Sequence, residues 1–213
     1  MCRVPAAFRC SAREVSTGSD GASLAGMNDI SVRVLGESEW HLYRTVRLGA
    51  LEESPDAFTA TLADEAQADE QLWRDRMARS HRLLAERQDA PLGIVSLGPY
   101  APDSSCGEIF GLYVFPEARG IGVAWALVEA AVALAADDRY RQVYYWVGVD
   151  NPRAIGFANN FGFRLTGHRR PARASDVDLG DEEIAMVFSV AEDTMSVPNP
   201  TSDRPAPHEG PLI

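Results

Sequence analysis

A short glycine-bearing segment, RGIGVA at residues 119–124, has the residue types that bind a phosphate group. It follows aromatic and β-branched residues that predict a strand, and it precedes apolar residues at helical spacing. The first N–H groups of a helix have no partner inside the helix and attract anions. Gly120 and Gly122 lack a Cβ, so a phosphate can approach the backbone closely. The segment therefore predicts a pyrophosphate-binding loop between a strand and a helix.

Two common phosphate-binding loops do not match this segment. The P-loop of nucleotide hydrolases has Lys followed by Ser or Thr after its glycines, and this sequence has no such pair there. A dinucleotide-binding fold would show Gly-x-Gly-x-x-Gly within a βαβ unit at the start of the chain, and neither feature is present. The sequence therefore disfavours both classes.

The elements that must position this loop follow the order β-α-α-β-β-β-α-β-α-β-β. Alternating apolar residues predict the strands, and apolar residues at helical spacing predict the helices. Mixed strands with helices beside a central sheet predict an α/β or α+β sandwich. The predicted strands span residues 30–35, 82–85, 92–97, 108–114, 143–149, 163–166 and 183–190, and the predicted helices span 38–53, 62–79, 123–136 and 152–161.

The breaks between these elements are predicted from residues that cap helices or turn the chain. Ser38 is the candidate cap of the first helix, and Asn151, followed by Pro, is the candidate cap of the last. Residues 88–91 predict the turn of a hairpin, and residues 169–180 predict a polar loop. Strand period places residues 108, 110, 112 and 114 on one face, unless a bulge intervenes.

The glycine segment resembles motif A of the GNAT superfamily, the acetyl-CoA-dependent N-acetyltransferases. That motif is Arg/Gln-x-x-Gly-x-Gly/Ala, and its positions are occupied here by Arg119, Gly122 and Ala124. Residues 151–163 resemble motif B, Asn-x-x-Ala-x-x-Leu-Tyr-x-x-x-Gly-Phe. The resemblance covers about residues 30–191 and implies the GNAT fold, a mixed central sheet of about six to seven strands flanked by about four helices. Residues 51–58 and 163–171 resemble the bacterial small-amine and protein acetyltransferase type, in which they border the acceptor site.

This resemblance implies an activity and a cofactor. The activity is transfer of an acetyl group from acetyl-CoA to a primary amine by direct attack, without a metal. The acceptor implied is a small molecule, a drug-like amine or a protein lysine or N-terminus, and the sequence does not choose between them. In the family, the motif B Asn hydrogen-bonds the pantetheine arm, and the strand before the loop pairs with its amides as in β-augmentation. Carried over, the cofactor-binding residues are Leu112, Tyr113, Val114, Arg119, Gly120, Ile121, Gly122, Val123, Ala124, Trp125 and Asn151.

The sequence departs from the family at the residues that usually transfer protons. The Tyr that many members use as an acid is Ala158 here, and the carboxylate that some members place on the strand before motif B is Trp146. Glu108 is the best remaining general base, with a solvated carboxylate at the strand start as the alternative. Stand-in acids, with core packing as the alternative role, are Tyr113, Tyr144 and Tyr145. A free thiol titrates with a pKa of about 8.5, so its thiolate can leave without an acid.

Length and composition bound the organisation of the chain. Its 213 residues, of which 46% are hydrophobic, predict one domain at 29–191, a disordered leader at 1–28 and a disordered acidic, Pro-rich tail at 192–213. Met27 is an alternative translation start. No apolar run approaches the roughly 20 residues that span a bilayer, and no signal peptide is evident. The three cysteines lack metal-ligand spacing, which favours a reducing cytoplasm.

The net charge of −11, in which all 20 basic side chains are arginine, bears on the partners. It argues against nucleic acid and against an anionic membrane surface, since both require basic patches. It is compatible with a cationic acceptor, or it serves solubility alone. Asp56, Asp176 and His168 are candidates to border the acceptor site, with solvation as the default. Homodimers are common in the family, and nothing in the sequence fixes this state.

A function of a different class is also open. Without the Tyr of motif B, the domain would be an acetyl-CoA sensor that binds the cofactor and does not turn it over. A purely structural protein would bind no CoA, which the glycine loop disfavours.

Overall fold

The computed structural model describes residues 30–55, 58, 60–172 and 182–190, and these residues form seven strands and five α-helices. The strands are β1 (Ser31–Val34), β2 (His81–Arg87), β3 (Ala90–Pro99), β4 (Cys106–Val114), β5 (Gln142–Gly148), β6 (Arg164–Pro171) and β7 (Glu182–Ser189). The helices are α1 (Trp40–Glu53), α2 (Leu62–Ala66), α3 (Glu70–Arg79), α4 (Val123–Asp137) and α5 (Pro152–Phe161). The predicted fold class is confirmed, whereas the predicted leader at 1–28 and tail at 192–213 lie outside the described residues.

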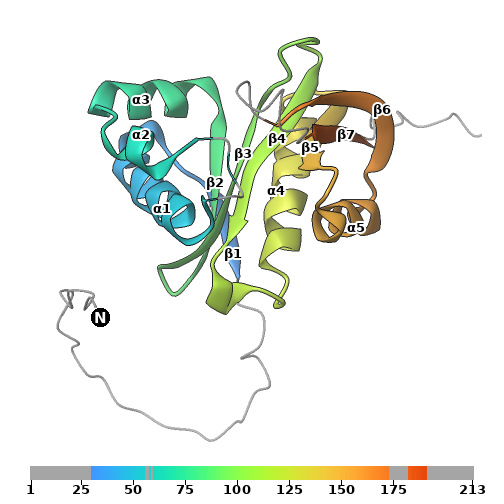
Figure 1. The fold of residues 1–213 in the computed structure, drawn as a ribbon. Coiled ribbons are helices and arrows are strands. Elements are labelled where there is room, and N and C mark those ends of the chain that lie inside the picture. The colour runs from blue at the N-terminus through green and yellow to red at the C-terminus, as the bar shows by residue number, and fades with distance from the viewer. Residues whose placement is uncertain (1–29, 56–57, 59, 173–181, 191–213) are drawn as a thin grey trace, which may run out of the picture.

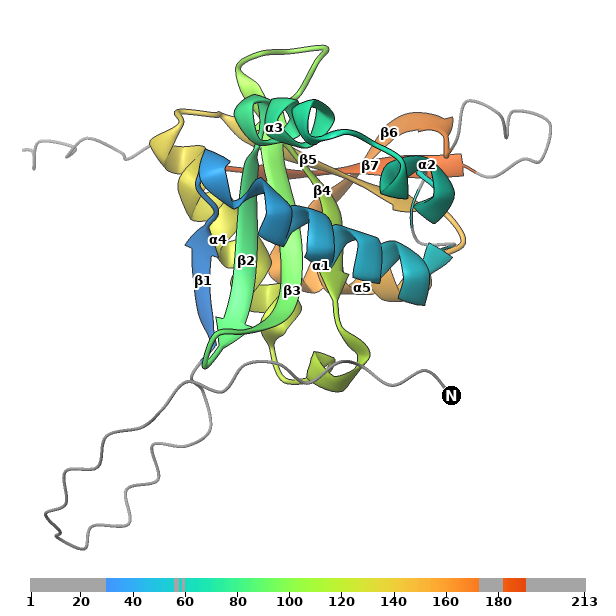
Figure 2. The same cartoon turned by 90° about the vertical axis from the view of Figure 1, so that its left-hand side faces the viewer.

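The strands form one mixed sheet in the order β1-β2-β3-β4-β5-β7-β6, in which only the β4–β5 pair is parallel. Helices α1 to α3 lie on one side of the sheet and α4 and α5 on the other (Figure 1). Figure 2 shows α1 crossing over β2 and β3. Within the described part of the chain, no helix is long and apolar enough to cross a membrane.

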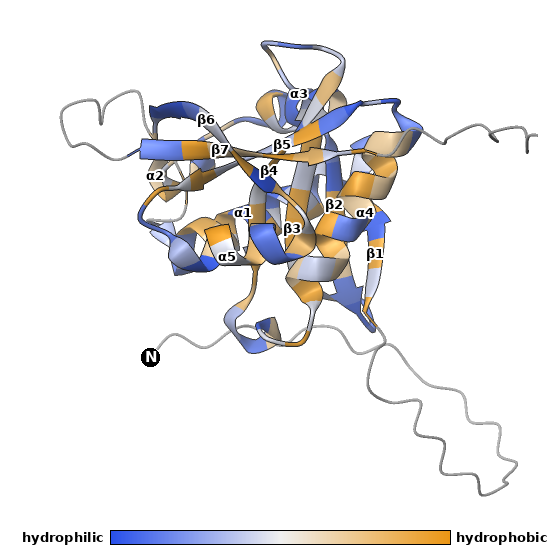
Figure 3. Ribbon diagram, turned by 90° about the vertical axis from the view of Figure 1, so that its right-hand side faces the viewer, coloured by the Kyte–Doolittle hydropathy of each residue, from blue (hydrophilic) through white to orange (hydrophobic). Residues whose placement is uncertain are grey.

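Each face of the sheet has its own hydrophobic core. On one face, Leu127 and Val128 of α4 are buried against strand residues such as Leu97. Figure 3 shows the hydrophobic colours concentrated on α4 and on the strands beside it. On the other face, Trp73 of α3 and Leu51 of α1 are among the largest fully buried side chains. The two cores fix the helices on both sides of β4 and β5.

The predicted single helix over residues 62–79 is wrong, because two side-chain caps divide it. The Thr61 side chain accepts a hydrogen bond from the Asp64 N–H and starts α2. The Asp69 side chain then accepts from the Leu72 N–H at 2.9 Å and starts α3. Asp and Thr side chains compete with the helix for backbone N–H groups, which favours new helix starts at these positions.

The predicted loop that begins at residue 169 is also wrong at its start, because β6 continues to Pro171. Within β6, Arg169 pairs with Ile184 and Arg170 pairs with Glu183 in the register with β7. The strand is exposed along almost its whole length and therefore lacks the apolar alternation that would reveal it in the sequence. Residues 173–180 of the predicted loop lie outside the described residues.

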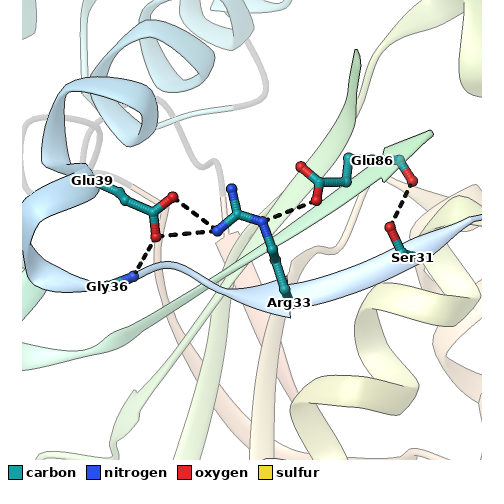
Figure 4. Close-up of polar contacts among 5 residues, drawn as sticks. All are labelled: Ser31, Arg33, Gly36, Glu39 and Glu86. Carbon is teal, nitrogen blue, oxygen red and sulfur yellow. Dashed lines mark hydrogen bonds and ion pairs between the residues drawn. The ribbon is translucent and has the colours of Figure 1, made fainter. Parts of the chain in front are cut away.

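The first helical turn begins from a network around Glu39 rather than from the predicted cap Ser38. The Gly36 N–H donates to the Glu39 carboxylate at 2.8 Å, and Arg33 of β1 donates to the same carboxylate at 2.9 Å. Arg33 also donates to Glu86 of β2 at 3.0 Å (Figure 4). The Gly36 hydrogen bond and the Arg33 guanidinium hold the pKa of Glu39 below its usual value. The network ties the edge of the sheet to the start of α1.

A β-bulge in β4 changes which side chains share a face. Ser96 of β3 pairs with Phe110, but Ile94 pairs with Tyr113, so β4 contains one extra residue around Gly111, whose φ is +62°. Tyr113 is therefore buried beneath α1, whereas Leu112 packs against the core beneath α4. The predicted common face for residues 108, 110, 112 and 114 is wrong because of this bulge.

The Glu39 network gives the first testable prediction. Glu39→Gln should lower the free energy of unfolding by about 1 kcal/mol or less at pH 7, as expected for a partly exposed ion pair and cap. Because folding lowers the pKa of Glu39, its contribution is present above the unfolded-state pKa and is lost as pH falls through the folded-state pKa. Urea denaturation from neutral to acidic pH should therefore show the variant and wild type converging in acid. Glu37→Gln, at an exposed neighbouring position, is the control. A difference in unfolding free energy between Glu39→Gln and wild type that stays the same at every pH would contradict the prediction.

Candidate active site

A groove opens where β4 and β5 separate. Their parallel register runs from Cys106 and Gln142 to Ile109 and Tyr145, and both strands then continue without pairing to each other. The groove has a volume of about 540 Å³. Of the residues predicted to bind the cofactor, it is lined by Leu112, Tyr113, Val114, Arg119, Gly120, Gly122, Val123, Ala124, Trp125 and Asn151. Ile121 is outside this lining, and its side chain is 44% exposed.

The glycine loop has the geometry of an anion-binding site at the start of α4. Gly120 and Gly122 have φ values of +82° and +95°, which L side chains rarely adopt. A Cβ built at either glycine would meet no heavy atom within 4 Å, so the space above the backbone is open. The N–H groups of the first turn of α4 have no acceptor within the helix. The positive φ values are thus a second reason for glycine at these two positions, besides the close approach of a phosphate to the backbone that the sequence suggested.

Arg119 is held by the protein and does not extend over the groove as a free cation. Its Nε donates to the Val114 carbonyl at 3.0 Å, and its Nη2 donates to the Glu53 carboxylate at 2.9 Å. Glu53 also accepts from the Tyr113 hydroxyl at 2.9 Å and from Ser54. These hydrogen bonds, first those of Ser54 and Tyr113, lower the pKa of Glu53. Sequence reasoning missed Glu53, which fixes the side chain of the motif A arginine.

Asn151 caps α5, as predicted. Its Oδ1 accepts a hydrogen bond from the Ala154 N–H at 2.9 Å. The side-chain amide group has separate donors on Nδ2, and Asn151 is exposed at the edge of the groove. The cap and a contact to a ligand in the groove can therefore coexist on one side chain.

A second cavity, of about 770 Å³, lies on the α1–α3 side of the sheet. Leu112 and Tyr145 line both this second cavity and the groove, so the two spaces meet at these residues. The second cavity is also lined by Glu108, Trp146, Arg170 and Glu183. A group held in the groove and a molecule in the second cavity would meet at Leu112 and Tyr145.

Glu108 is a half-buried carboxylate beside this meeting point. Its side chain is 19% exposed, and Arg170 of β6 lies 3.5 Å away and bonds Glu183 at 2.7 Å. Burial raises the pKa of Glu108, while the Arg170 charge opposes this shift. The Arg170 guanidinium also lies over the Trp146 ring at 4.3 Å. Arg170 lies in the segment 163–171 that the resemblance placed at the acceptor site, but its place on β6 and its pairing with Glu108 and Glu183 were not predicted, because the strand was expected to end before it.

Among the candidate acids, Tyr145 alone lines both spaces. Burial raises the pKa of Tyr145 to about 12, so its hydroxyl stays protonated at neutral pH. Tyr113 donates to Glu53 and lies beneath α1. Tyr144 stacks on Tyr100 with ring centroids 4.2 Å apart. Ala158 is fully buried and has no side-chain hydrogen-bonding group, so it supplies no acid.

The remaining candidates are placed only in part. His168 is exposed on β6, where its backbone N–H donates to the Thr166 hydroxyl, and it is not among the described residues that line the second cavity. Asp56 and Asp176 lie outside the described residues.

Comparisons with known proteins agree with this geometry. Residues 48–163 match the Acetyltransferase (GNAT) family, which is more than half of the chain, and the chain therefore belongs to the GNAT family. It is 31% identical over 132 residues to mycothiol acetyltransferase of Cellulomonas flavigena, covering 58% of this chain and 37% of that protein. The chain thus spans well under two thirds of this curated relative.

Two solved structures share the fold. The yncA protein of Salmonella typhimurium, solved with its cofactor acetyl-CoA, has a TM-score of 0.61 and 17% identity, covering 78% of this chain and 97% of that one. A GNAT family acetyltransferase from Elizabethkingia anophelis with acetyl-CoA bound has a TM-score of 0.56 and 15% identity, covering 76% and 99%. At these identities the comparison establishes the fold.

The cap and the free amide donors of Asn151 give a second prediction. Asn151→Ser keeps a capping oxygen, so its thermal unfolding should match that of wild type. Asn151→Ala loses the cap, so its free energy of unfolding should be lower by about 1 kcal/mol. Both variants lose the amide donors, and both should bind acetyl-CoA more weakly in calorimetric titration. Equal destabilisation by Ser and Ala would contradict the capping role, and unchanged affinity in both would contradict the ligand contact.

Proposed function

We propose that the protein is an acetyl-CoA-dependent N-acetyltransferase that transfers an acetyl group to a primary amine by direct attack. The observation that carries this proposal is the meeting of the groove and the second cavity at Leu112 and Tyr145, beside Glu108. Family membership and two neighbours solved with acetyl-CoA support the choice of donor. The scarcity of cysteine supports the cytoplasm as its compartment.

Acetyl-CoA would bind along the groove. Its pyrophosphate would accept hydrogen bonds from the N–H groups of the loop at Gly120 to Ala124, at the positive end of α4. The pantetheine amides would pair with the backbone of Leu112 and Val114, on the edge of β4 that β5 leaves open. The Nδ2 group of Asn151 would donate to the same arm. The thioester then lies near Leu112 and Tyr145.

The acceptor amine must be neutral to attack the thioester carbon. An alkylamine is mostly protonated at pH 7, so a base that removes its proton increases the reactive fraction. Glu108 lines the second cavity, and burial raises its pKa, which makes the carboxylate a stronger base than an exposed one. One proton would pass from the ammonium group to Glu108, directly or through a water molecule, before attack. The second proton would leave the nitrogen to water as the tetrahedral intermediate expels the thiolate.

The leaving thiolate is stabilised rather than fully protonated in this proposal. A Tyr145 pKa of about 12 exceeds the thiol value of about 8.5, so complete proton transfer would cost roughly 5 kcal/mol. Tyr145 can still donate a hydrogen bond to the developing negative charge, because its hydroxyl remains protonated. This accounts for activity without the usual Tyr, whose position is the buried Ala158.

The absence of a hydroxyl at Ala158 favours one second candidate, an acetyl-CoA sensor without turnover. Release of CoA thiol from acetyl-CoA, measured against alkylamines, hydrazides, amino acids and lysine peptides, separates the two functions. Release that requires an amine supports the transferase. Thermal stabilisation by acetyl-CoA without release on any amine supports the sensor.

The role of Glu108 gives a third prediction. Glu108→Gln should lower kcat/KM by about a hundredfold near neutral pH, the usual scale for a lost general base. Wild-type kcat/KM should rise with pH as Glu108 ionises, and the variant should lack this rise. The difference should shrink at high pH, where the amine loses its proton without help. Glu182→Gln, which removes a carboxylate paired with Arg169, is the control, and an unchanged pH profile for Glu108→Gln would sink the assignment.

The glycine loop gives a fourth prediction. Gly122→Ala places a Cβ at a φ of +95°, which costs on the order of 1–2 kcal/mol or distorts the loop. The Kd for acetyl-CoA should rise by about tenfold or more, since each 1.4 kcal/mol is tenfold. Gly156→Ala in α5 has open space around its Cβ and no positive φ, so affinity should not change. Equal affinities for the two variants would contradict a phosphate site at this loop.

A further inference from the structure

One wall of the second cavity carries an excess of positive charge, although the whole chain is acidic. Among the described residues that line this wall, Arg47, Arg76, Arg79 and Arg82 are accompanied by the carboxylate Glu65. Glu65 is buried and is shared by Arg47 and Arg76, each at 3.2 Å. One carboxylate thus serves two of the four guanidinium groups.

Arg82 is the unusual member of this wall. It is 4% exposed, and its Nη2 donates to the Arg76 carbonyl at 2.9 Å. Its Nε and Nη1 groups are buried without a hydrogen-bond partner. The rings of Tyr43 and Phe110 lie 4.7 and 5.2 Å from its guanidinium carbon, and both rings line the second cavity. Phe110 is 37% exposed. Arg82 is therefore a fixed cation behind the surface of the cavity.

The environment of Arg82 is unfavourable for a positive charge when the second cavity holds no anion. Burial lowers its pKa, and the neighbouring charges of Arg76, Arg47 and Arg79 act in the same direction. A buried cation with unused donors is strongly destabilising unless an anion compensates it. A ligand with a negative group in this part of the second cavity would supply that compensation.

The strand pairing sets the distance between the arginine-rich wall and β4, the strand that carries Glu108. Arg82 pairs with Ser96, which pairs with Phe110, so Arg82 lies two strand spacings, on the order of 10 Å, from β4. Glu108 lies two residues before Phe110 on β4, next to Glu183 at the other end of the second cavity. The second cavity thus has an arginine-rich end and a carboxylate-bearing end.

We propose that the acceptor is a primary amine that also carries an anionic group, a carboxylate or a phosphate, bound at the Arg82 wall. This proposal rests on the proposed transferase function and assigns the substrate class of the same site. The amine lies between Glu108 and the thioester, and the anionic group lies toward Arg82 and Arg79. The cationic acceptor that net charge favours does not fit this wall, because like charges would meet there.

The first experiment compares short primary amines that differ in the charge of the group at the other end of the molecule. The rate of CoA release would be measured with β-alanine and γ-aminobutyrate, with phosphoethanolamine, with propylamine, which has no second charged group, and with the diamine putrescine. The anionic amines should show a kcat/KM about tenfold or more above propylamine, and putrescine should be the poorest. Comparison of kcat/KM for the two carboxylates with kcat/KM for phosphoethanolamine identifies the preferred anionic group. Equal or higher activity on putrescine would overturn the proposal.

Two variants test whether Arg82 and Arg79 cause the preference. Arg82→Met removes the buried charge with a side chain of similar length, and Arg79→Gln removes an exposed one. The ratio of kcat/KM for the anionic amines to kcat/KM for propylamine should fall about tenfold in Arg82→Met and less in Arg79→Gln. Arg74→Gln, on the same helix and paired with Glu70, is the control and should keep the wild-type ratio. An unchanged ratio in both test variants would overturn the proposal.

A binding measurement keeps this inference separate from the transferase function. The N-acetyl derivatives of β-alanine and propylamine would be titrated calorimetrically into the protein with CoA bound. Tighter binding of N-acetyl-β-alanine, abolished in Arg82→Met, supports the anionic site even if no amine is acetylated. Acetylation without any preference for the anionic member would retain the transferase and reject the site. Stabilisation of Arg82→Met by acetyl-CoA shows that the variant is folded.

Discussion

The separation of β4 from β5 is the constraint on which the rest of the site depends. Parallel pairing ends at Ile109 and Tyr145, and the bulge at Gly111 turns β4 away immediately afterwards. An unpaired strand edge in a protein interior leaves N–H and C=O groups without partners, which is costly unless something pairs with them. A ligand with amide groups would resolve that cost. The groove and the second cavity share Leu112 and Tyr145 in their linings where the two strands separate.

The charged side chains around the second cavity are only partly neutralised by their partners. Arg170 is shared by Glu108 and Glu183 on one side, whereas Glu65 is shared by Arg47 and Arg76 on the other. Shared partners leave a residual negative charge at the first group and a residual positive charge at the second. Since arginine stays protonated at all physiological pH values, the positive wall is permanent.

Local patterns in the sequence were sufficient for the fold and for the groove. Residues that are close in the chain determine the glycine segment, the Asn151 cap and the order of elements. The structure brings ten of the eleven expected cofactor residues into the lining of the groove. The errors arose where local signals compete or are absent. Asp69 starts a new helix inside an otherwise helical pattern, and the bulge at Gly111 reverses the facing of every later residue in β4. Neither event has a periodic signature.

On the acceptor side, the sequence indicated two bordering segments and Glu108 but not the charged groups that surround the second cavity. Arg82, Glu65 and Arg170 are far apart in the chain and meet only through strand pairing and helix packing. From the sequence alone each is expected at the surface, and the burial of Arg82 and Glu65 follows from the tertiary fold. Net charge was compatible with a cationic acceptor and did not decide its class, because it averages over the surface, whereas recognition depends on the few charges around one cavity.

Glu53, at the end of α1, connects the two halves of the site. It accepts hydrogen bonds from Arg119 of the glycine loop and from Tyr113 of β4, and α1 also carries Arg47 of the acceptor wall. If a bound pyrophosphate moved the loop, these hydrogen bonds would couple that movement to the helix that carries Arg47. In the proposed transferase, such a coupling would favour an order of addition in which acetyl-CoA binds before the amine.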